Sequence, residues 1–261
     1  MKSVRRIAVI ALQNFKESVR ERVLYNLIVF ALLLIGAAIL FGRISVGVEQ
    51  IILVNLGLSS ISAFGLLMAI FIGISLVWKE IDRRTIYSIL AKPVRRPEFI
   101  IGKYFGLVGT LLINTAIMTT GFYVALLYDK GRLELSDFRA LGAVYMILLQ
   151  LALVVGVALL FSCISTPILS AVFTLCVYVI GNFLNDIRWF GQETNSAWVE
   201  KLTTFLYYLL PNFGNFNVIS RTAHGESVPG YLLLSNSLYT LLYLAILISA
   251  AILIFEEREF R

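Results

Sequence analysis

Ionisable side chains are scarce in this chain. Only 15% of its 261 residues are Asp, Glu, Lys or Arg, and there is a single histidine. Hydrophobic residues make up 59% of the chain, and the mean hydropathy is +0.87. Soluble globular domains are usually nearer one half apolar. The composition therefore excludes a soluble globular domain and predicts a chain that lies mostly in lipid.

The residues of a catalytic or metal site are also lacking. Cys163 and Cys176 lie in separate apolar runs with no CxxC pair, so we expect both to be buried packing residues. His224 lies in a polar turn without a second histidine or cysteine nearby, which favours an ordinary loop residue over a metal ligand. A nucleophile needs a base and an orienting partner, and the apolar runs contain no ionisable residue. We expect no catalytic and no metal site.

Several functional motifs are missing too. No GxxxxGK[ST] loop is present, so this chain is not itself the ATPase. No nucleic-acid-binding motif accompanies the net charge of +6, so nucleic acid is not an expected partner. The basic start at 1–22 has too short an apolar run for a signal peptide and no cleavage site, so we expect it to be retained. Self-powered carriers usually hold ionisable residues at membrane depth. The energy for any transport would therefore come from another subunit.

Long uncharged apolar runs are what the chain does contain. Each is long enough to cross a hydrocarbon layer of about 30 Å as a helix, and in lipid helices satisfy their own backbone hydrogen bonds. The runs are Val23–Phe41, Ile51–Val77, Tyr104–Leu127, Ala140–Cys163, Ile168–Asn185 and Tyr231–Phe255. We predict an all-α, polytopic membrane protein with six transmembrane helices in a single transmembrane domain, 1–261.

The distribution of Lys and Arg predicts the orientation. Six spans place both termini and the loops 78–103 and 164–167 on one side, with 15 Lys and Arg, against 7 on the other. By the positive-inside rule, both termini are cytoplasmic. The positive charge then faces anionic lipid headgroups.

Two segments outside the spans have amphipathic patterns. In 1–22, a helical stripe predicts a helix in the cytoplasmic interface, and a plain extension of the first span is the alternative; the stripe is Val4, Ile7, Ala8, Ala11, Phe15 and Val19. In the external loop 186–230, an apolar face precedes Pro211 and predicts a short helix or hairpin dipping into the outer leaflet; that face is Trp198, Leu202, Phe205, Leu206 and Leu209.

Weakly polar residues within the spans are candidates for a transport pathway. Hydrogen bonding between helices is their commoner role. The candidates for pathway or packing are Asn55, Asn114, Gln150, Asn182 and Asn236. Gly65, Ala69 and Gly73 are spaced by four and would let another helix approach the second span closely.

The cytoplasmic loop 78–103 is basic and contains two prolines. Pro93 ends a short helix because its ring removes a donor and clashes with the preceding turn. Pro97 suits the first turn of a new helix, with Glu98 near the positive end of the helix dipole. The loop is therefore predicted to be helix, basic break, helix.

This loop resembles the coupling segment in the membrane subunits of type-2 ABC exporters. The matching positions are Glu80, Thr85, Ile89-Leu90-Ala91, Pro93-Val94, Arg96 and Gly102-Lys103, whereas Arg84 stands where the family often has glycine. The six-span layout extends the similarity over nearly the whole chain. The stretch "YYLLPNFGNFNV" also resembles a segment of bacterial members similar to the nitrous-oxide-reductase maturation permease.

The resemblance implies a half-transporter of the bacterial inner membrane. Two permease copies would pair as a homodimer, each docking its coupling loop on an ABC ATP-binding subunit that carries ATP and Mg²⁺, with no cofactor in this chain. The implied coupling residues are Glu80, Asp82, Arg83, Arg84, Thr85, Tyr87, Ser88, Lys92, Pro93, Arg95 and Arg96. Two alternatives remain open: a non-transporting subunit that passes motion to an extracytoplasmic partner, and an ATP-independent carrier or channel.

Overall fold

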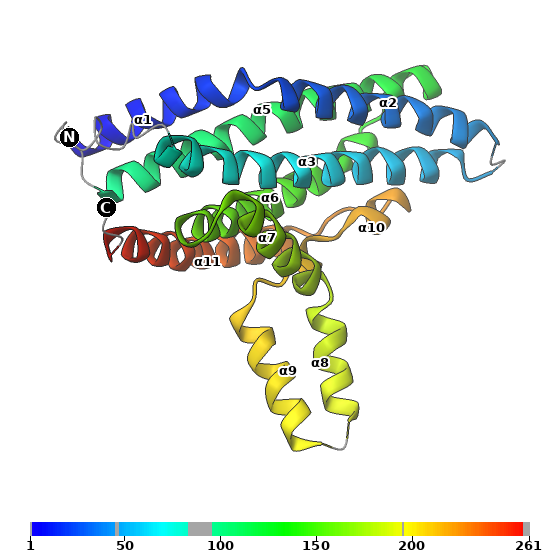
Figure 1. Cartoon of the computed structure of the whole chain (residues 1–261). Helices are drawn as coiled ribbons and strands as arrows, with labels where there is room; N and C mark the ends of the chain where they lie inside the picture. The colour runs from blue at the N-terminus through cyan, green and yellow to red at the C-terminus, as the bar shows by residue number, and fades with distance from the viewer. Residues whose placement is uncertain (1, 45–46, 83–95, 195, 258–261) are drawn as a thin grey trace.

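The computed structural model describes residues 2–44, 47–82, 96–194 and 196–257, and every element in these ranges is a helix. In chain order they are α1 (Lys2–Val19), α2 (Arg22–Ile44), α3 (Glu49–Asp82), α5 (Arg96–Lys130), η1 (Asp137–Arg139), α6 (Ala140–Ile164), α7 (Pro167–Asn182), α8 (Leu184–Glu193), α9 (Ala197–Leu209), η2 (Phe213–Phe216), α10 (Ile219–Ala223) and α11 (Gly230–Glu257). The long helices form one bundle, from which α8 and α9 project (Figure 1).

Most of the predicted spans are present as continuous helices. In the described part of the chain, α2, α3, α5, α6 and α11 are each long and apolar enough to cross a membrane. The fifth predicted span, Ile168–Asn185, is wrong as a single helix, because α7 ends at Asn182 and α8 continues at an angle of 56°. Apolarity continues through the break, so composition alone did not reveal it. The chain is all-helical with five to six candidate spans.

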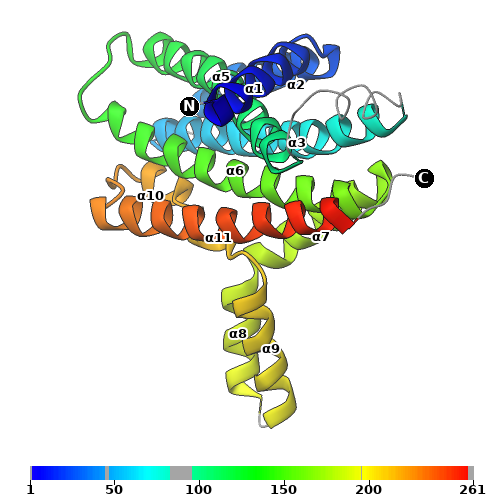
Figure 2. The ribbon, with the colours of Figure 1, turned by 90° about the vertical axis from the view of Figure 1, so that its left-hand side faces the viewer.

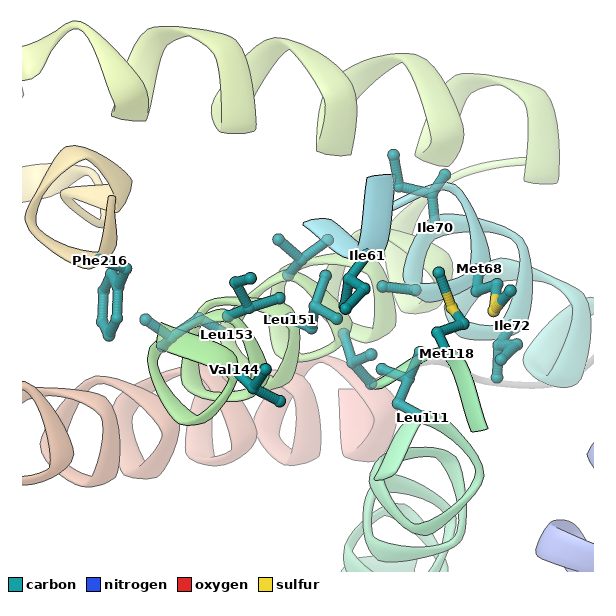
Figure 3. Packing of buried hydrophobic residues seen from close by; sticks show 14 of the residues in the cluster. Ile61, Met68, Ile70, Ile72, Leu111, Met118, Val144, Leu151, Leu153 and Phe216 are labelled. Atoms are coloured by element: carbon teal, nitrogen blue, oxygen red, sulfur yellow. The ribbon is translucent and has the colours of Figure 1, made fainter. Parts of the chain in front are cut away.

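The core lies between α3 and its neighbours α5 and α6 (Figure 3). Small residues let α6 approach α3 closely: a Cβ atom on Gly65 would lie 2.6 Å from Leu151, and one on Gly73 would lie 2.6 Å from Ala158. The spacing of small residues on the second span thus marks the contact with α6. Figure 3 shows Ile61 and Met68 of α3 facing Leu151 and Met118 of the other two helices.

Helix α1 packs lengthwise along α5 (Figures 1 and 2). Asn14 and Ser18 are its most buried side chains, whereas Val4 and Ala8 of the predicted apolar stripe are exposed. Ile7, Ala11 and Phe15 of the stripe do lie toward glycines of α5, so the stripe marks part of the packed face. A pattern of apolar residues could not include the two polar side chains. The position of α1 in the membrane interface stays a prediction.

Helices α8 and α9 form a hairpin that projects from the side of the bundle (Figures 1 and 2). The helix predicted before Pro211 is present as Ala197–Leu209. The hairpin begins earlier than the predicted loop 186–230, because α8 starts at Leu184. Its two helices pack closely at Gly191, where a Cβ atom would lie 2.0 Å from the Thr203 hydroxyl.

The two cysteines differ in environment. Cys163 is buried in the core, as predicted. Cys176 is exposed on α7, so the prediction that both are buried is wrong for this residue. An apolar run does not specify which helix face meets protein and which is left uncovered.

Candidate coupling site and pathway residues

The described structure holds the two ends of the predicted coupling segment. Glu80 and Asp82 lie at the end of α3, and Arg96 begins α5. The other predicted coupling residues lie outside the described residues, and they are Arg83, Arg84, Thr85, Tyr87, Ser88, Lys92, Pro93 and Arg95. As predicted, Pro97 stands in the first turn of the second helix, with Glu98 beside it.

Long, continuous helices carry both ends of this segment. Helix α3 has 34 residues and α5 has 35. At about 1.5 Å per residue each is about 50 Å long, compared with about 30 Å for the hydrocarbon layer. The ends of the segment are therefore continuous with helices that run through the bundle, so a displacement there moves a whole span.

Glu98 ties the start of α5 to α1. Its side chain is buried, with 6% of the residue exposed. The Ser3 hydroxyl donates a 2.6 Å hydrogen bond to Oε1, and Arg6 Nη1 lies 3.6 Å from Oε2. The carboxylate also lies in the first helical turn, where the helix dipole favours negative charge. Sequence reasoning placed Glu98 at the helix start but missed Ser3 and Arg6, because nothing local links residues so far apart.

Lys103 follows in the next turns of α5 and is almost completely buried, with 1% exposed. Its Nζ atom lies 4.5 Å from the centroid of the Phe99 ring, in a cation–π contact. Phe99 in turn stacks on Phe255 of α11, with ring centroids 5.9 Å apart. The first turns of α5 therefore contact both α1 and the end of α11. We name the end of the bundle where these three helices meet the junction end.

Two glycines let α1 lie against α5 at this junction. A Cβ atom on Gly102 would lie 2.8 Å from Ile10 Cβ, and one on Gly106 would lie 2.7 Å from the carbonyl oxygen of Ala11. Asn14 of α1 donates a 3.1 Å hydrogen bond to the backbone oxygen of Lys103. The Gly102-Lys103 pair of the family-like motif thus has a structural role in this chain, because it is where the start of α5 meets α1.

The pathway candidates fall into two groups: Asn114 and Gln150 bond between helices, and the other three bond within one helix. Asn114 donates to Met68 Sδ at 3.5 Å, and Gln150 donates to the Tyr178 hydroxyl at 3.3 Å, so both link different helices. Asn182 and Asn236 donate to carbonyl oxygens four residues earlier in their own helices. Asn55 accepts from the Ser59 hydroxyl at 3.3 Å and lines a hollow.

That hollow lies between α2 and α3, at the end of the bundle opposite the junction. It measures about 520 Å³, and its walls are Phe41, Ile44, Ile51, Ile52, Asn55 and Leu56. The lining is apolar except for the single amide. It can therefore receive a hydrocarbon chain and offer one hydrogen-bonding group beside it.

A second, more polar cavity of about 220 Å³ lies at the same end of the bundle. It is lined by Gln50, Asp137, Arg139 and His224, among others. Asp137 pairs with Lys130, and Arg139 donates a 2.9 Å hydrogen bond to the Gly225 carbonyl. His224 Nδ1 lies 2.8 Å from the carbonyl oxygen of Ser220. Its charged groups are thus engaged in holding the α5–α6 turn and α10 together.

A bundle of long apolar helices with this arrangement defines a multi-pass membrane protein. A family model described as "ABC-2 family transporter protein" matches residues 8–260, so the chain belongs to the ABC-2 family of transporter proteins. The membrane component of that family is the permease of an ABC transporter and normally partners with an ATP-binding subunit. Comparison with curated proteins gave no match.

Proposed function

We propose that this chain is the permease of an ATP-driven exporter and that the segment 78–103 docks on a separate ATP-binding subunit. Two copies would form the passage as a homodimer in a bacterial inner membrane, with both termini in the cytoplasm. ATP and Mg²⁺ would be bound by the partner subunit. The observation that carries the proposal is the direct continuation of both ends of the segment into long helices of the bundle.

The junction end supports a mechanical role for this segment. A push on the start of α5 acts on α1 through Glu98 and on α11 through Phe99. Packed helices shift as units because close-packed contacts do not deform continuously. ATP-driven displacement of the segment would therefore move three helices together, which a loop held by a flexible linker would not do.

The hollow beside Asn55 supports an amphipathic or lipid-like cargo. Its apolar walls suit acyl chains, whereas a bare ion would find no charged ligand among its lining residues. Family membership supports this ATP-driven function over an independent carrier or channel. A subunit that transmits motion to an extracytoplasmic partner would dock on the ATP-binding subunit through the same segment, and the complex would hydrolyse ATP but move no solute into or out of vesicles.

The test is purification of the chain from its native membrane in mild detergent, with mass spectrometry of its partners and an ATPase assay. We expect a P-loop ATPase in equal amount, lost in the double variant Arg83→Glu/Arg84→Glu. The control Lys16→Glu/Arg20→Glu makes the same charge change on two exposed residues of the N-terminal region and should retain the ATPase. Equal retention by both variants, at equal membrane insertion, would contradict the docking proposal.

A further inference from the structure

We infer that the chain binds a phospholipid with an anionic, hydroxylated headgroup at the end of the bundle opposite the junction. Two cavities lie there, the apolar hollow of about 520 Å³ and the polar cavity of about 220 Å³. Ile51 lines both of them, so the two cavities adjoin at this residue. A lipid joins a polar part and an apolar part in the same way. The inference rests on the proposed function, whose cargo class it makes specific.

The two cavities extend to different depths along α3. Gln50, in the first turn of α3, lines the polar cavity together with residues of the α5–α6 turn and α10. Leu56 lines the hollow and lies six residues further along the helix, about 9 Å at about 1.5 Å per residue. Figure 1 shows α10 at the end of the bundle where α3 begins, away from both termini. The hollow therefore reaches deeper into the hydrocarbon layer, as the chains of a lipid lie deeper than its headgroup.

Arg139 supplies the polar cavity with a cation. Its side chain is exposed, and its Nη1 atom donates one hydrogen bond of 2.9 Å to the Gly225 carbonyl. A guanidinium has five N–H donors in a fixed fork that matches the oxygens of a phosphate. Asp137 also lines the cavity, but its charge is balanced by the ion pair with Lys130. The lining therefore favours an anionic oxygen beside Arg139.

His224 and Gln50 supply the same cavity with groups that suit a hydroxyl. His224 Nδ1 lies 2.8 Å from the Ser220 carbonyl oxygen, which can only accept, so Nδ1 carries the proton. In the neutral ring Nε2 is then an acceptor. The exposed amide of Gln50 offers both a donor and an acceptor. A glycerol headgroup can use these groups, whereas a choline headgroup has no N–H to donate and carries a positive charge toward Arg139.

The hollow is accessible to an acyl chain from the side of the bundle. Phe41 and Ile44 of α2 and Leu56 of α3 line it and are exposed. A chain can therefore enter from the surrounding hydrocarbon without crossing water. Asn55 carries the single amide of the lining, and its Oδ1 atom accepts from the Ser59 hydroxyl. Its Nδ2 group can donate to an ester oxygen where the acyl chain joins the headgroup.

Native mass spectrometry of the full chain, released from vesicles, tests this site. The vesicles contain equal amounts of phosphatidylglycerol and phosphatidylcholine with the same acyl chains. We expect the chain to retain phosphatidylglycerol several-fold more often than phosphatidylcholine. Arg139→Gln should abolish this preference. Leu56→Trp fills the hollow and should lower the retention of phosphatidylglycerol several-fold, and it leaves the bond between Arg139 and Gly225 intact.

Each variant has a matched control. Arg132→Gln removes an exposed cation of the same α5–α6 turn that lines neither cavity. Leu33→Trp adds the same ring to an exposed position of α2 outside the hollow. Both controls should retain phosphatidylglycerol as the unmodified chain does. The double variant Arg83→Glu/Arg84→Glu should also retain it, so that failure of ATPase docking and failure of lipid binding are observed separately.

Two results would overturn the inference. Equal retention of phosphatidylglycerol by Leu56→Trp, Arg139→Gln and their controls would show that neither cavity holds the lipid. Displacement of phosphatidylglycerol by an equal concentration of soluble glycerol 3-phosphate would show that the polar cavity takes a free anion and that the hollow contributes nothing. Survival of the bound lipid in excess glycerol 3-phosphate, with its loss in both cavity variants, is the result that we expect.

Discussion

The Ser3 hydroxyl donates a 2.6 Å hydrogen bond to the Glu98 carboxylate, and the two residues are 95 positions apart in the chain. This contact joins the beginning of α1 to the first turn of α5, within the segment 78–103 that is proposed to receive force. Arg6 approaches the same carboxylate from α1. The N-terminal helix is therefore attached to the start of α5 and not merely to the start of the first span.

Replacing Glu98 tests the strength of this attachment. Glu98→Ala should lower stability by about 1 to 3 kcal/mol, because it removes a buried, charged acceptor and with it the hydrogen bond that holds α1 to α5. Glu98→Gln keeps an acceptor for Ser3, and the lost ion pair with Arg6 contributes less than about 1 kcal/mol because Arg6 is 37% exposed. Thermal unfolding in detergent would measure both effects.

A control for this pair is Glu134→Ala, which removes an exposed ion pair with Arg132. Its melting temperature should match that of the unmodified chain. Equal melting temperatures for Glu98→Ala and Glu134→Ala would show that the buried carboxylate does not hold α1.

Gly106 tests the close approach of α1 and α5. Gly106→Ala places a Cβ atom 2.7 Å from the backbone oxygen of Ala11, so the helices must separate, at a cost of about 1 to 3 kcal/mol. Gly109→Ala on the same helix meets only Phe15 at 3.7 Å and gains helix propensity. We expect the melting temperature to fall for the first variant and to hold or rise for the second. A similar fall in both variants would point to a general intolerance of substitution in α5.

Substitutions of Asn114 and Asn55 distinguish a role in helix packing from a role in the transport pathway. Asn114→Ala removes a buried amide between α5 and α3 and should lower the melting temperature. Asn55→Ala alters only the lining of the hollow and a bond within α3, so the melting temperature should change little. In vesicles containing the ATPase complex, the Asn55 variant should instead change the stimulation of ATP hydrolysis by added lipid-like compounds. The opposite pattern would assign the structural role to Asn55.

The orientation of the chain in the membrane can be measured by labelling introduced cysteines in spheroplasts. In a background without Cys163 and Cys176, Leu135→Cys should react with a membrane-impermeant maleimide, since Leu135 is 91% exposed in the turn expected outside. Lys16→Cys should react only after permeabilisation. Reaction of Lys16→Cys alone in intact spheroplasts would reverse the proposed topology.

The sequence predicted the long helices well, because uncharged runs of sufficient length have few alternatives in lipid. It also predicted the helix start at Pro97 and the end of α9 before Pro211, where proline acts locally. It did not predict the break after Asn182, since Phe183 and Leu184 continue the apolar run. The contacts of Ser3 with Glu98 and of Asn14 with the Lys103 carbonyl were also missed, because they join segments that are distant in the chain and involve polar residues of α1.

The most direct test of the central claim is photo-crosslinking from the segment 78–103 in the native membrane. A photoreactive amino acid at Ser88 should form an adduct with a P-loop ATPase, whereas the same group at Ser136, in the α5–α6 turn, should not. ATP with a hydrolysis-blocking inhibitor should change the yield at Ser88, because the subunits that grip the segment would close. Absence of an ATPase adduct from Ser88 and from Tyr87, with adducts to other proteins forming normally, would contradict the account.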